Sequence, residues 1–165
     1  MEKIAWLVLG GVTFVAALRA GNSLRAMYVG RVALGVLFIV FGALVNAIYL
    51  IAQPDYYATF ADASPFPYVT DTWNTLVLSH QNFFITVLII FEASMGVLVL
   101  SGGRRTQIGL IGLIGFHVGQ LAFGGVLWPW AAVMLTALLL LLRAERQAAP
   151  GLAARYTKDP DHVHT

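Results

Sequence analysis

The stretch QIGLIGLIGFHVGQLAFGG, residues 107–125, alternates glycine with branched apolar residues and carries a histidine, His117, near its middle. A run of about 20 apolar residues is the length that an α-helix needs to cross a bilayer. Small residues three or four positions apart share one face of such a helix and let a neighbouring helix approach closely. The stretch therefore predicts a tightly packed membrane helix with an imidazole in apolar surroundings. The glycines of the shared face are Gly109, Gly112, Gly115 and Gly119.

The composition of the chain is that of an integral membrane protein. Apolar residues make up 59% of the 165 positions and charged residues only 11%, whereas a soluble domain carries about a quarter charged residues. The chain has no cysteine, which excludes disulfide relays, thiolate metal sites and thioether-attached haem. It also lacks a phosphate-binding glycine loop, a Ser/His/Asp set and a basic nucleic-acid patch. We therefore expect the lipid bilayer as a partner, and no nucleic acid.

Five apolar stretches predict an all-α fold: a polytopic membrane helix bundle with a four-helix core plus one additional N-terminal transmembrane helix. The bundle is expected to form a single domain over residues 1–146, followed by a polar cytoplasmic tail over residues 147–165. We interpret the first stretch as a retained helix and not as a cleaved signal peptide, because Arg19 follows it directly. The expected spans are residues 4–20, 31–52, 80–101, 107–127 and 129–143, with an outer loop over residues 53–79.

The cationic residues set the expected orientation of the bundle. Nine of the ten Lys and Arg residues fall on one side of the membrane if the N-terminus is outside and the C-terminus is cytoplasmic. Cytoplasmic loops carry an excess of Lys and Arg, so the count favours this orientation. The nine residues are Arg19, Arg25, Arg31, Arg104, Arg105, Arg143, Arg146, Arg155 and Lys158.

The predicted outer loop has a distinctive composition. It contains three aspartates, three prolines and six aromatic residues, but no Lys or Arg. Aromatic rings favour the headgroup zone, so we expect the loop to lie flat on the outer interface. It is either an ordinary interfacial connector or a lid over a ligand site. Polar and aromatic residues expected at the same level form a predicted outer vestibule: Asn46, Tyr49, His80, Gln81, Asn82 and Trp128.

The second expected span carries a stripe of residues spaced by three and four positions. Such a spacing places all of them on one face of a helix. We expect this face to pack against a neighbouring helix, with its glycines permitting a close approach. The stripe consists of Arg31, Gly35, Phe38, Gly42, Asn46 and Tyr49.

Two ionisable residues are expected near the middle of the bilayer. Glu92 lies ten residues before Gly102, and His117 lies ten residues after Gln107, on two helices that a short hairpin makes antiparallel neighbours. At 1.5 Å per residue both lie roughly 15 Å deep, about half the hydrocarbon thickness. Because buried ionisable groups need partners, we expect the two side chains within hydrogen-bonding reach, directly or through one water or ligand. Gln120 is the expected third member.

Three interpretations of this pair stay open. It holds two helices in register, it handles protons or binds a redox cofactor, or its members do not meet. A haem between two histidines is excluded, because His80 lies roughly 18 Å along the helix from Glu92 and so far from the level of His117. We expect no metal site, since no level of the chain offers enough ligands. His162 and His164 are read as part of a disordered tail, with weak metal binding as the alternative.

Two segments resemble the DoxX-like family of small bacterial membrane proteins: RVALGVLFIVFGALVN (residues 31–46) and FEASMGVLVLSGGRRTQIGL (residues 91–110). The resemblance covers about two-thirds of the chain and implies a four-helix bundle in a bacterial plasma (inner) membrane. The chain departs from the pattern in its additional N-terminal helix and in Asn46, where relatives often carry a lysine. The positions that carry the resemblance are Arg31, Gly35, Gly42, Glu92, Gly96 and Arg105.

The family includes a subunit similar to one of a thiosulfate:quinone oxidoreductase and a partner in a mycobacterial oxidative-defence assembly. The resemblance thus implies a membrane subunit associated with quinone-linked or oxidative-stress redox chemistry. No intrinsic cofactor is evident, and a quinone or lipid is the expected bound molecule. The alternative is a non-catalytic scaffold of a larger membrane complex, and the third interpretation is a small proton-coupled transporter. We expect a membrane-protein partner or a homo-oligomer, and assign no catalytic residue.

Overall fold

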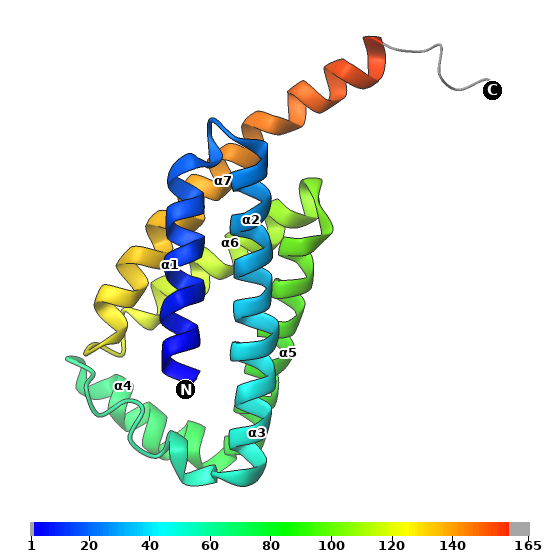
Figure 1. The fold of residues 1–165 in the computed structure, drawn as a ribbon. Helices are drawn as coiled ribbons and strands as arrows, with labels where there is room; N and C mark the ends of the chain where they lie inside the picture. Colours follow the sequence, from blue (N-terminus) through cyan, green and yellow to red (C-terminus); the bar gives the residue numbers. More distant parts are fainter. Residues whose placement is uncertain (1, 159–165) are drawn as a thin grey trace.

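The computed structural model describes the backbone of residues 2–158 and the side chains of residues 4–148. Within that backbone range all regular elements are helical, which confirms the predicted all-α bundle. Figure 1 shows the long helices side by side, with the α1–α2 and α5–α6 connections at one end of the bundle. The elements are α1 (Glu2–Ala20), α2 (Leu24–Val36), the π-helix η1 (Leu37–Leu44), α3 (Val45–Ala52), the 3₁₀-helix η2 (Pro54–Tyr57), α4 (Pro67–Thr72), the π-helix η3 (Trp73–Val77), the 3₁₀-helix η4 (Leu78–His80), α5 (Gln81–Ser101), α6 (Gly103–Gln120) and α7 (Leu127–Lys158).

Three continuous helical segments are long and apolar enough to cross a membrane: Leu24–Ala52, Pro67–Ser101 and Leu127–Ala148. The helix over Ile4–Ala20 is apolar but shorter. These segments present many apolar side chains on the outside of the bundle, as contact with a bilayer requires. The five predicted apolar stretches therefore correspond to five helical rods, of which three are both long and apolar enough to cross a membrane.

The helices differ in extent from the predicted membrane spans. The second helix begins at Leu24 and not at residue 31, because Ser23 caps it by accepting a hydrogen bond from the backbone N–H of Ala26. The fourth begins at Gly103 and ends at Gln120, short of residue 127, since Gly124 and Gly125 adopt positive φ angles of 70° and 57° that a helix does not contain.

The C-terminal helix is longer than its predicted span. α7 continues to Lys158, well past residue 143, and projects beyond the rest of the bundle (Figure 1). Residues 147–158, expected as part of a disordered tail, are thus helical. His162 and His164 lie outside the described residues, so the predicted alternatives for them stay predictions.

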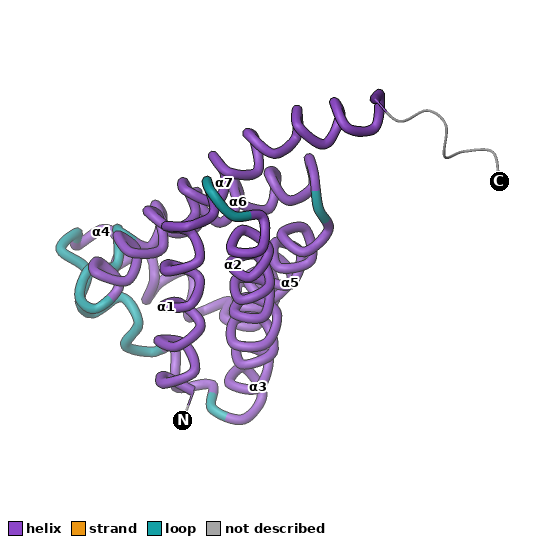
Figure 2. The backbone as a smooth tube through the Cα atoms, turned by 45° about the horizontal axis from the view of Figure 1, so that its top comes forward, coloured by secondary structure: helices purple, strands orange, loops and turns teal. Residues whose placement is uncertain are grey.

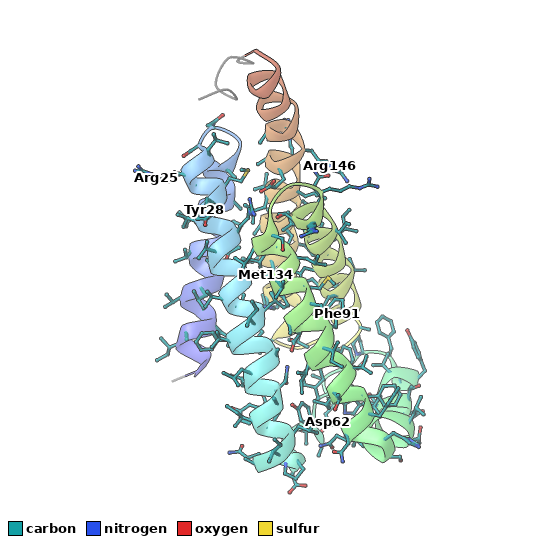
Figure 3. All side chains as sticks on the ribbon, turned by 90° about the vertical axis from the view of Figure 1, so that its right-hand side faces the viewer. Arg25, Tyr28, Asp62, Phe91, Met134 and Arg146 are labelled. Carbon is teal, nitrogen blue, oxygen red and sulfur yellow. The ribbon has the colours of Figure 1, made fainter. Side chains whose placement is uncertain are left out.

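The stripe of the second span faces the interior, as predicted. Arg31, Gly35, Phe38 and Gly42 are buried, and the stripe lies against α5 and α6. A Cβ atom built on Gly35 would lie 2.6 Å from the Leu100 side chain. The apolar core between these helices and α7 includes Leu34, Leu37, Phe38, Val99, Leu110, Leu113, Met134, Leu138 and Leu141. Figure 3 shows Met134 in the middle of the bundle.

The glycines of α6 divide into two groups, and only one of them fits the prediction. Gly109 and Gly112 lie against α5, where a Cβ on Gly109 would approach the backbone nitrogen of Val99 to 2.9 Å and one on Gly112 would overlap Met95. Gly115 and Gly119 have no neighbour within 4 Å of an added Cβ, so their predicted packing within the chain is wrong. At about 100° per residue, Gly115 points nearly opposite to the buried face that carries Leu113.

A buried ion pair closes the end of the bundle that holds the α5–α6 connection. Arg31 Nη1 lies 2.9 Å from Glu145 Oε1 of α7, and both side chains are buried. Arg31 also donates to the carbonyls of Val99 and Leu100 at the end of α5, at 3.0 and 3.3 Å. The arginine therefore joins α2, α5 and α7. Glu145 was not recognised as its partner in the sequence, because the two residues lie far apart in the chain.

The segment over residues 53–79 folds back against the other end of the bundle, as Figures 1 and 2 show around α4. Ala61 is fully buried within it, and Ser64 donates a hydrogen bond of 2.6 Å to the carbonyl of Ala122, in the α6–α7 connection. Trp73 and Phe60 both pack on Phe123 of that connection. The segment therefore forms a packed cap with its own short helices, and its position on the outer membrane interface stays a prediction.

Candidate functional site

Glu92 lies on the face of α5 that meets the second span. Its side chain is 3% exposed, and its Oε2 accepts a hydrogen bond of 2.8 Å from Asn46 Nδ2 of α3. A Cβ built on Gly42 would lie 2.9 Å from its carboxyl carbon, so a larger residue at this position would displace the carboxyl group from where it lies. The glycine and the amide together make a polar niche between two apolar helices.

Tyr57, from the cap segment, completes a hydrogen-bonded chain. Its hydroxyl donates to Asn46 Oδ1 at 2.9 Å and lies 3.1 Å from the Asn46 carbonyl oxygen. Because the phenol donates to Oδ1, the amide nitrogen of Asn46 must face Glu92, where the carboxyl oxygen is an acceptor. The order Tyr57–Asn46–Glu92 thus runs from the cap into the bundle.

Two further tyrosines surround this chain. The ring of Tyr56 stacks on Tyr49 of α3 with centroids 4.2 Å apart and meets Tyr57 edge-on at 5.3 Å. Burial raises the pKa of Tyr57 to about 12, and the neighbouring Tyr56, Glu92 and Tyr49 raise that pKa further in the same direction. The Tyr57 phenol is therefore protonated at physiological pH and serves as a donor. We call Glu92, Asn46, Tyr57, Tyr49 and Tyr56 the Glu92 cluster.

The backbone beside the Glu92 cluster is irregular. Residues 37–44 form the π-helix η1, which includes Phe38 and Gly42. Short π-helical segments are rare and often occur at functional sites, since they re-aim side chains and loosen the backbone hydrogen bonding. The indole Nε1 of Trp6, from α1, donates to the carbonyl of Phe41 within this segment at 3.2 Å. The niche for Glu92 is thus built on a distorted stretch of the second span.

His117 is buried nearby but has different neighbours. It is 1% exposed, and its Nδ1 lies 2.8 Å from the carbonyl of Leu113, one turn earlier in α6. A carbonyl only accepts, so Nδ1 carries the proton. The imidazole meets the rings of Phe38 and Phe116 edge-on, with centroids 5.9 and 5.6 Å away. These contacts are those of a packed aromatic core.

The predicted pairing of Glu92 with His117 is not direct. Contacts of Phe91 with Phe116, and of Met95 with Gly112, put α5 and α6 in a register that places the pair near the same level, as the hairpin count suggested. Their side chains turn to different partners, Asn46 and the Leu113 carbonyl, and the described residues include no hydrogen bond between them. A bridging water or ligand stays a prediction.

Gln120, the expected third member, lies at the end of α6. Its Oε1 is buried and accepts no hydrogen bond from the described residues, and neither Glu92 nor His117 is its partner. Within the same described part of the chain, no three His, Asp or Glu side chains are grouped as metal ligands.

The predicted outer vestibule is not one cavity-lining group. Asn46 and Tyr49 belong to the Glu92 cluster, whereas His80 is exposed and contacts the carbonyl of Leu76 in its own helix at 3.2 Å. Trp128 is also exposed and donates to the Leu121 carbonyl. His80 and the exposed Asn82 lie at the lead into α5, whereas Trp128 lies at the start of α7. The vestibule prediction is therefore wrong for this second group.

Gln81 has a different role from the one predicted. Its Nε2 donates to the carbonyl of Pro54 at 3.0 Å and so fastens the start of the cap to the start of α5. The cap is also held by Trp73, whose indole donates to the carbonyl of Tyr57 at 2.9 Å. Sequence reasoning missed Tyr57 itself, which stood among six aromatic residues of the cap with nothing to single it out. Tyr57 differs from the other aromatic residues of the cap only because the folded cap brings its hydroxyl to Asn46.

Comparison of the chain with protein-family models, with curated proteins and with solved structures gave no match.

Proposed function

We propose that this chain is a membrane subunit that serves quinone-linked redox chemistry, with the Glu92 cluster as the place where a quinone head group is bound. The observation that carries the proposal is the buried chain of Tyr57, Asn46 and Glu92. It joins a phenol, an amide and a carboxyl group inside an apolar bundle. A ligand site of this kind has mostly apolar walls and a few convergent polar groups that fix orientation.

The residues of the cluster fit a quinone chemically. A quinone exchanges electrons together with protons, and its ring oxygens need hydrogen-bonding partners in apolar surroundings. Glu92 supplies an acceptor for a hydroxyl proton, Tyr57 holds a proton at physiological pH, and Asn46 links the two. The stacked rings of Tyr49 and Tyr56 supply a flat apolar surface beside them. The electrons would come from a partner protein.

The resemblance to the DoxX-like family supports the same proposal. Of the six positions that carry it, five lie at the contact between the second span and α5. Gly35 meets Leu100, Gly42 meets Glu92, and Gly96 meets Ile39. Arg31 bonds the last carbonyls of α5, while Arg105 is exposed near the hairpin. The positions that carry the resemblance are therefore mostly those at which the second span packs on α5 around Glu92.

We also propose that the protein lies in a bacterial plasma membrane with its N-terminus outside and its C-terminus in the cytoplasm. The α1–α2 turn, the α5–α6 turn and the far end of α7 share one end of the bundle (Figure 1). These segments carry Arg19, Arg25, Arg104, Arg105, Arg143 and Arg146. The cap at the opposite end has three aspartates and no Lys or Arg. The positive-inside rule supports this orientation.

Organic extraction of the purified protein tests the proposed function. We expect quinone, identified by its ultraviolet spectrum and by mass spectrometry, in the extract of the wild type and much less in that of Glu92→Gln. His80→Gln is the matched control, because His80 is exposed and outside the cluster. Equal quinone in all three extracts, or none in the wild type under mild detergent, would contradict the proposal.

One observation favours a scaffold as the second candidate. Gly115 and Gly119 turn a face of small residues away from the rest of the chain, as helices that pack on a partner in lipid often do. A scaffold would retain its partner subunits in a mild-detergent pull-down without carrying quinone. In that case Glu92→Gln would leave both the extract and the set of co-purifying proteins unchanged.

A further inference from the structure

A groove runs between α1 and α2 on the outside of the bundle, away from the Glu92 cluster. Its volume is about 560 Å³, which lies within the range of small-molecule sites, about 300–1,000 Å³. Both helices are joined by a short turn next to one end of the groove (Figure 1). The groove is lined by Gly11, Val12, Val15, Ala16, Arg19, Ser23, Arg25, Ala26 and Val29.

The lining changes from apolar to cationic along the groove. Val12, Val15 and Val29 form exposed apolar walls, with the buried Ala16 between the helices. Arg19 and Arg25 line the end next to the α1–α2 turn. At 1.5 Å per residue, Arg19 lies about 10 Å along α1 from Val12. The groove thus has an apolar part along α1 and α2 and a cationic part near the turn that joins them.

The two arginines have no carboxylate partner among the described side chains. Among the side chains over residues 4–148, the ion pair formed is that of Arg31 with Glu145, so Arg19 and Arg25 lack a carboxylate partner there. Figure 3 shows Arg25 pointing away from the bundle. Ser23 uses its oxygen as an acceptor for the Ala26 N–H, which leaves the hydroxyl proton able to donate. The charged end therefore offers several donors to an anion.

We propose that this groove binds one anionic phospholipid of the bilayer. An acyl chain lies along the valine walls, and the phosphate lies between Arg19 and Arg25, with Ser23 as an additional donor. Guanidinium groups recognise phosphate through paired N–H···O bonds. The order of the lining, apolar and then cationic at the end of a membrane helix, matches the order of the parts of a lipid. The charge selects an anionic headgroup over a zwitterionic one.

Two pairs of variants test the two parts of the groove. Gly11→Leu fills the apolar part without a clash, because an added Cβ has no neighbour within 4 Å. Gly115→Leu is its control, since Gly115 is equally open but lies on α6 outside the groove. The double variant Arg19→Gln/Arg25→Gln removes the charge, and Arg104→Gln/Arg105→Gln removes the same charge at the α5–α6 hairpin.

The measurement is native mass spectrometry of the full chain in detergent, titrated with phosphatidylglycerol or with phosphatidylcholine of the same acyl chains. We expect the wild type to bind one phosphatidylglycerol with a preference over phosphatidylcholine of roughly tenfold or more, which Arg19→Gln/Arg25→Gln removes. Gly11→Leu should weaken binding of the lipid, and both controls should bind like the wild type.

Three outcomes would overturn the proposal. The first is equal binding of the two lipids to the wild type. The second is the same loss of preference in Arg104→Gln/Arg105→Gln as in the groove variant, which would mean that net charge alone attracts the lipid. The third is full competition by millimolar inorganic phosphate together with unchanged binding in Gly11→Leu, which would make the site one for a free anion.

Discussion

At the scale of single residues, Asn46 decides how the Glu92 cluster is arranged. Its amide accepts from Tyr57 on one side and donates to Glu92 on the other, so it is a fixed two-sided connector. An amide can do both at once, because its oxygen accepts and its nitrogen donates.

Replacement of Tyr57 by phenylalanine should destabilise the protein without unfolding it. The variant keeps the ring contact with Tyr56 but removes the donor to Asn46, and one lost buried hydrogen bond costs about 1–2 kcal/mol. Thermal unfolding in detergent should show a lower midpoint for Tyr57→Phe. The control Tyr68→Phe, on an exposed tyrosine of the same cap, should match the wild type. Equal midpoints for all three would mean that Tyr57 does not reach Asn46.

The same tyrosine gives a pH dependence at alkaline pH. The pKa of Tyr57 is raised from about 10 in the unfolded chain to about 12 in the folded protein, chiefly by burial. A raised pKa means that the folded state holds the proton more tightly, so the contribution to stability is complete below about pH 10 and is lost as the pH rises through about 12. The difference in unfolding midpoint between wild type and Tyr57→Phe should therefore shrink over that interval. A constant difference would contradict the raised pKa.

At the scale of elements, the spacing of small residues along a helix does not by itself tell which face of that helix packs against its neighbours. The glycine spacing in α6 predicted one packing face, but only Gly109 and Gly112 meet α5, and the buried face also carries Leu113 and His117. The stripe of the second span was predicted correctly, because it combines glycines with larger residues that must also face the interior. A pattern of glycines alone does not tell a face toward the chain from a face toward lipid.

Alanine substitutions at different glycines of α6 should therefore change the thermal unfolding midpoint in different directions. Gly109→Ala should lower the unfolding midpoint, since its Cβ would meet the backbone of α5 at 2.9 Å and backbone cannot move aside cheaply. Gly115→Ala has open space, and alanine is favoured over glycine in a helix by up to about 1 kcal/mol, so its midpoint should stay the same or rise. Thermal unfolding of the two variants side by side is the measurement. A loss with Gly115→Ala as large as with Gly109→Ala would place that face in a contact.

The sequence predicts the number and order of the long helices because each apolar run is local and long. It predicts less well what joins them. The Arg31–Glu145 pair and the contact of Tyr57 with Asn46 depend on segments brought together only by the complete fold. The depth of Glu92 and His117 in the bundle could be counted from the hairpin. The direction in which each side chain points depends on the rotation of its helix about its own axis, and a helix that is apolar on all sides does not fix that rotation.

At the scale of the whole molecule, the bundle has two unlike ends. One end holds the Arg31–Glu145 pair and the basic turns, and the other is closed by the cap over residues 53–79. Figure 3 shows Arg25 and Arg146 at the first end and Asp62 at the other. The cap joins α3, the start of α5 and the α6–α7 connection, so it closes the bundle directly over the Glu92 cluster.

Single cysteines test the proposed orientation, because the chain has none of its own. Ser79→Cys lies in the cap segment and Gln147→Cys lies near the far end of α7. A membrane-impermeant maleimide applied to intact cells should label Ser79→Cys, and should label Gln147→Cys only after the membrane is permeabilised. The reverse pattern would invert the orientation, and with it the side from which the cap is reached.

Titration of the purified protein with a short-chain quinone, followed by quenching of its aromatic fluorescence, tests whether the Glu92 cluster binds a quinone. The wild type should bind saturably, and both Glu92→Gln and Tyr57→Phe should weaken binding, by roughly tenfold for the carboxyl group. His117→Phe should bind like the wild type, since His117 packs among aromatic rings outside the hydrogen-bonded chain. Unchanged affinity in Glu92→Gln, or an equal loss in His117→Phe, would contradict a quinone site at the Glu92 cluster.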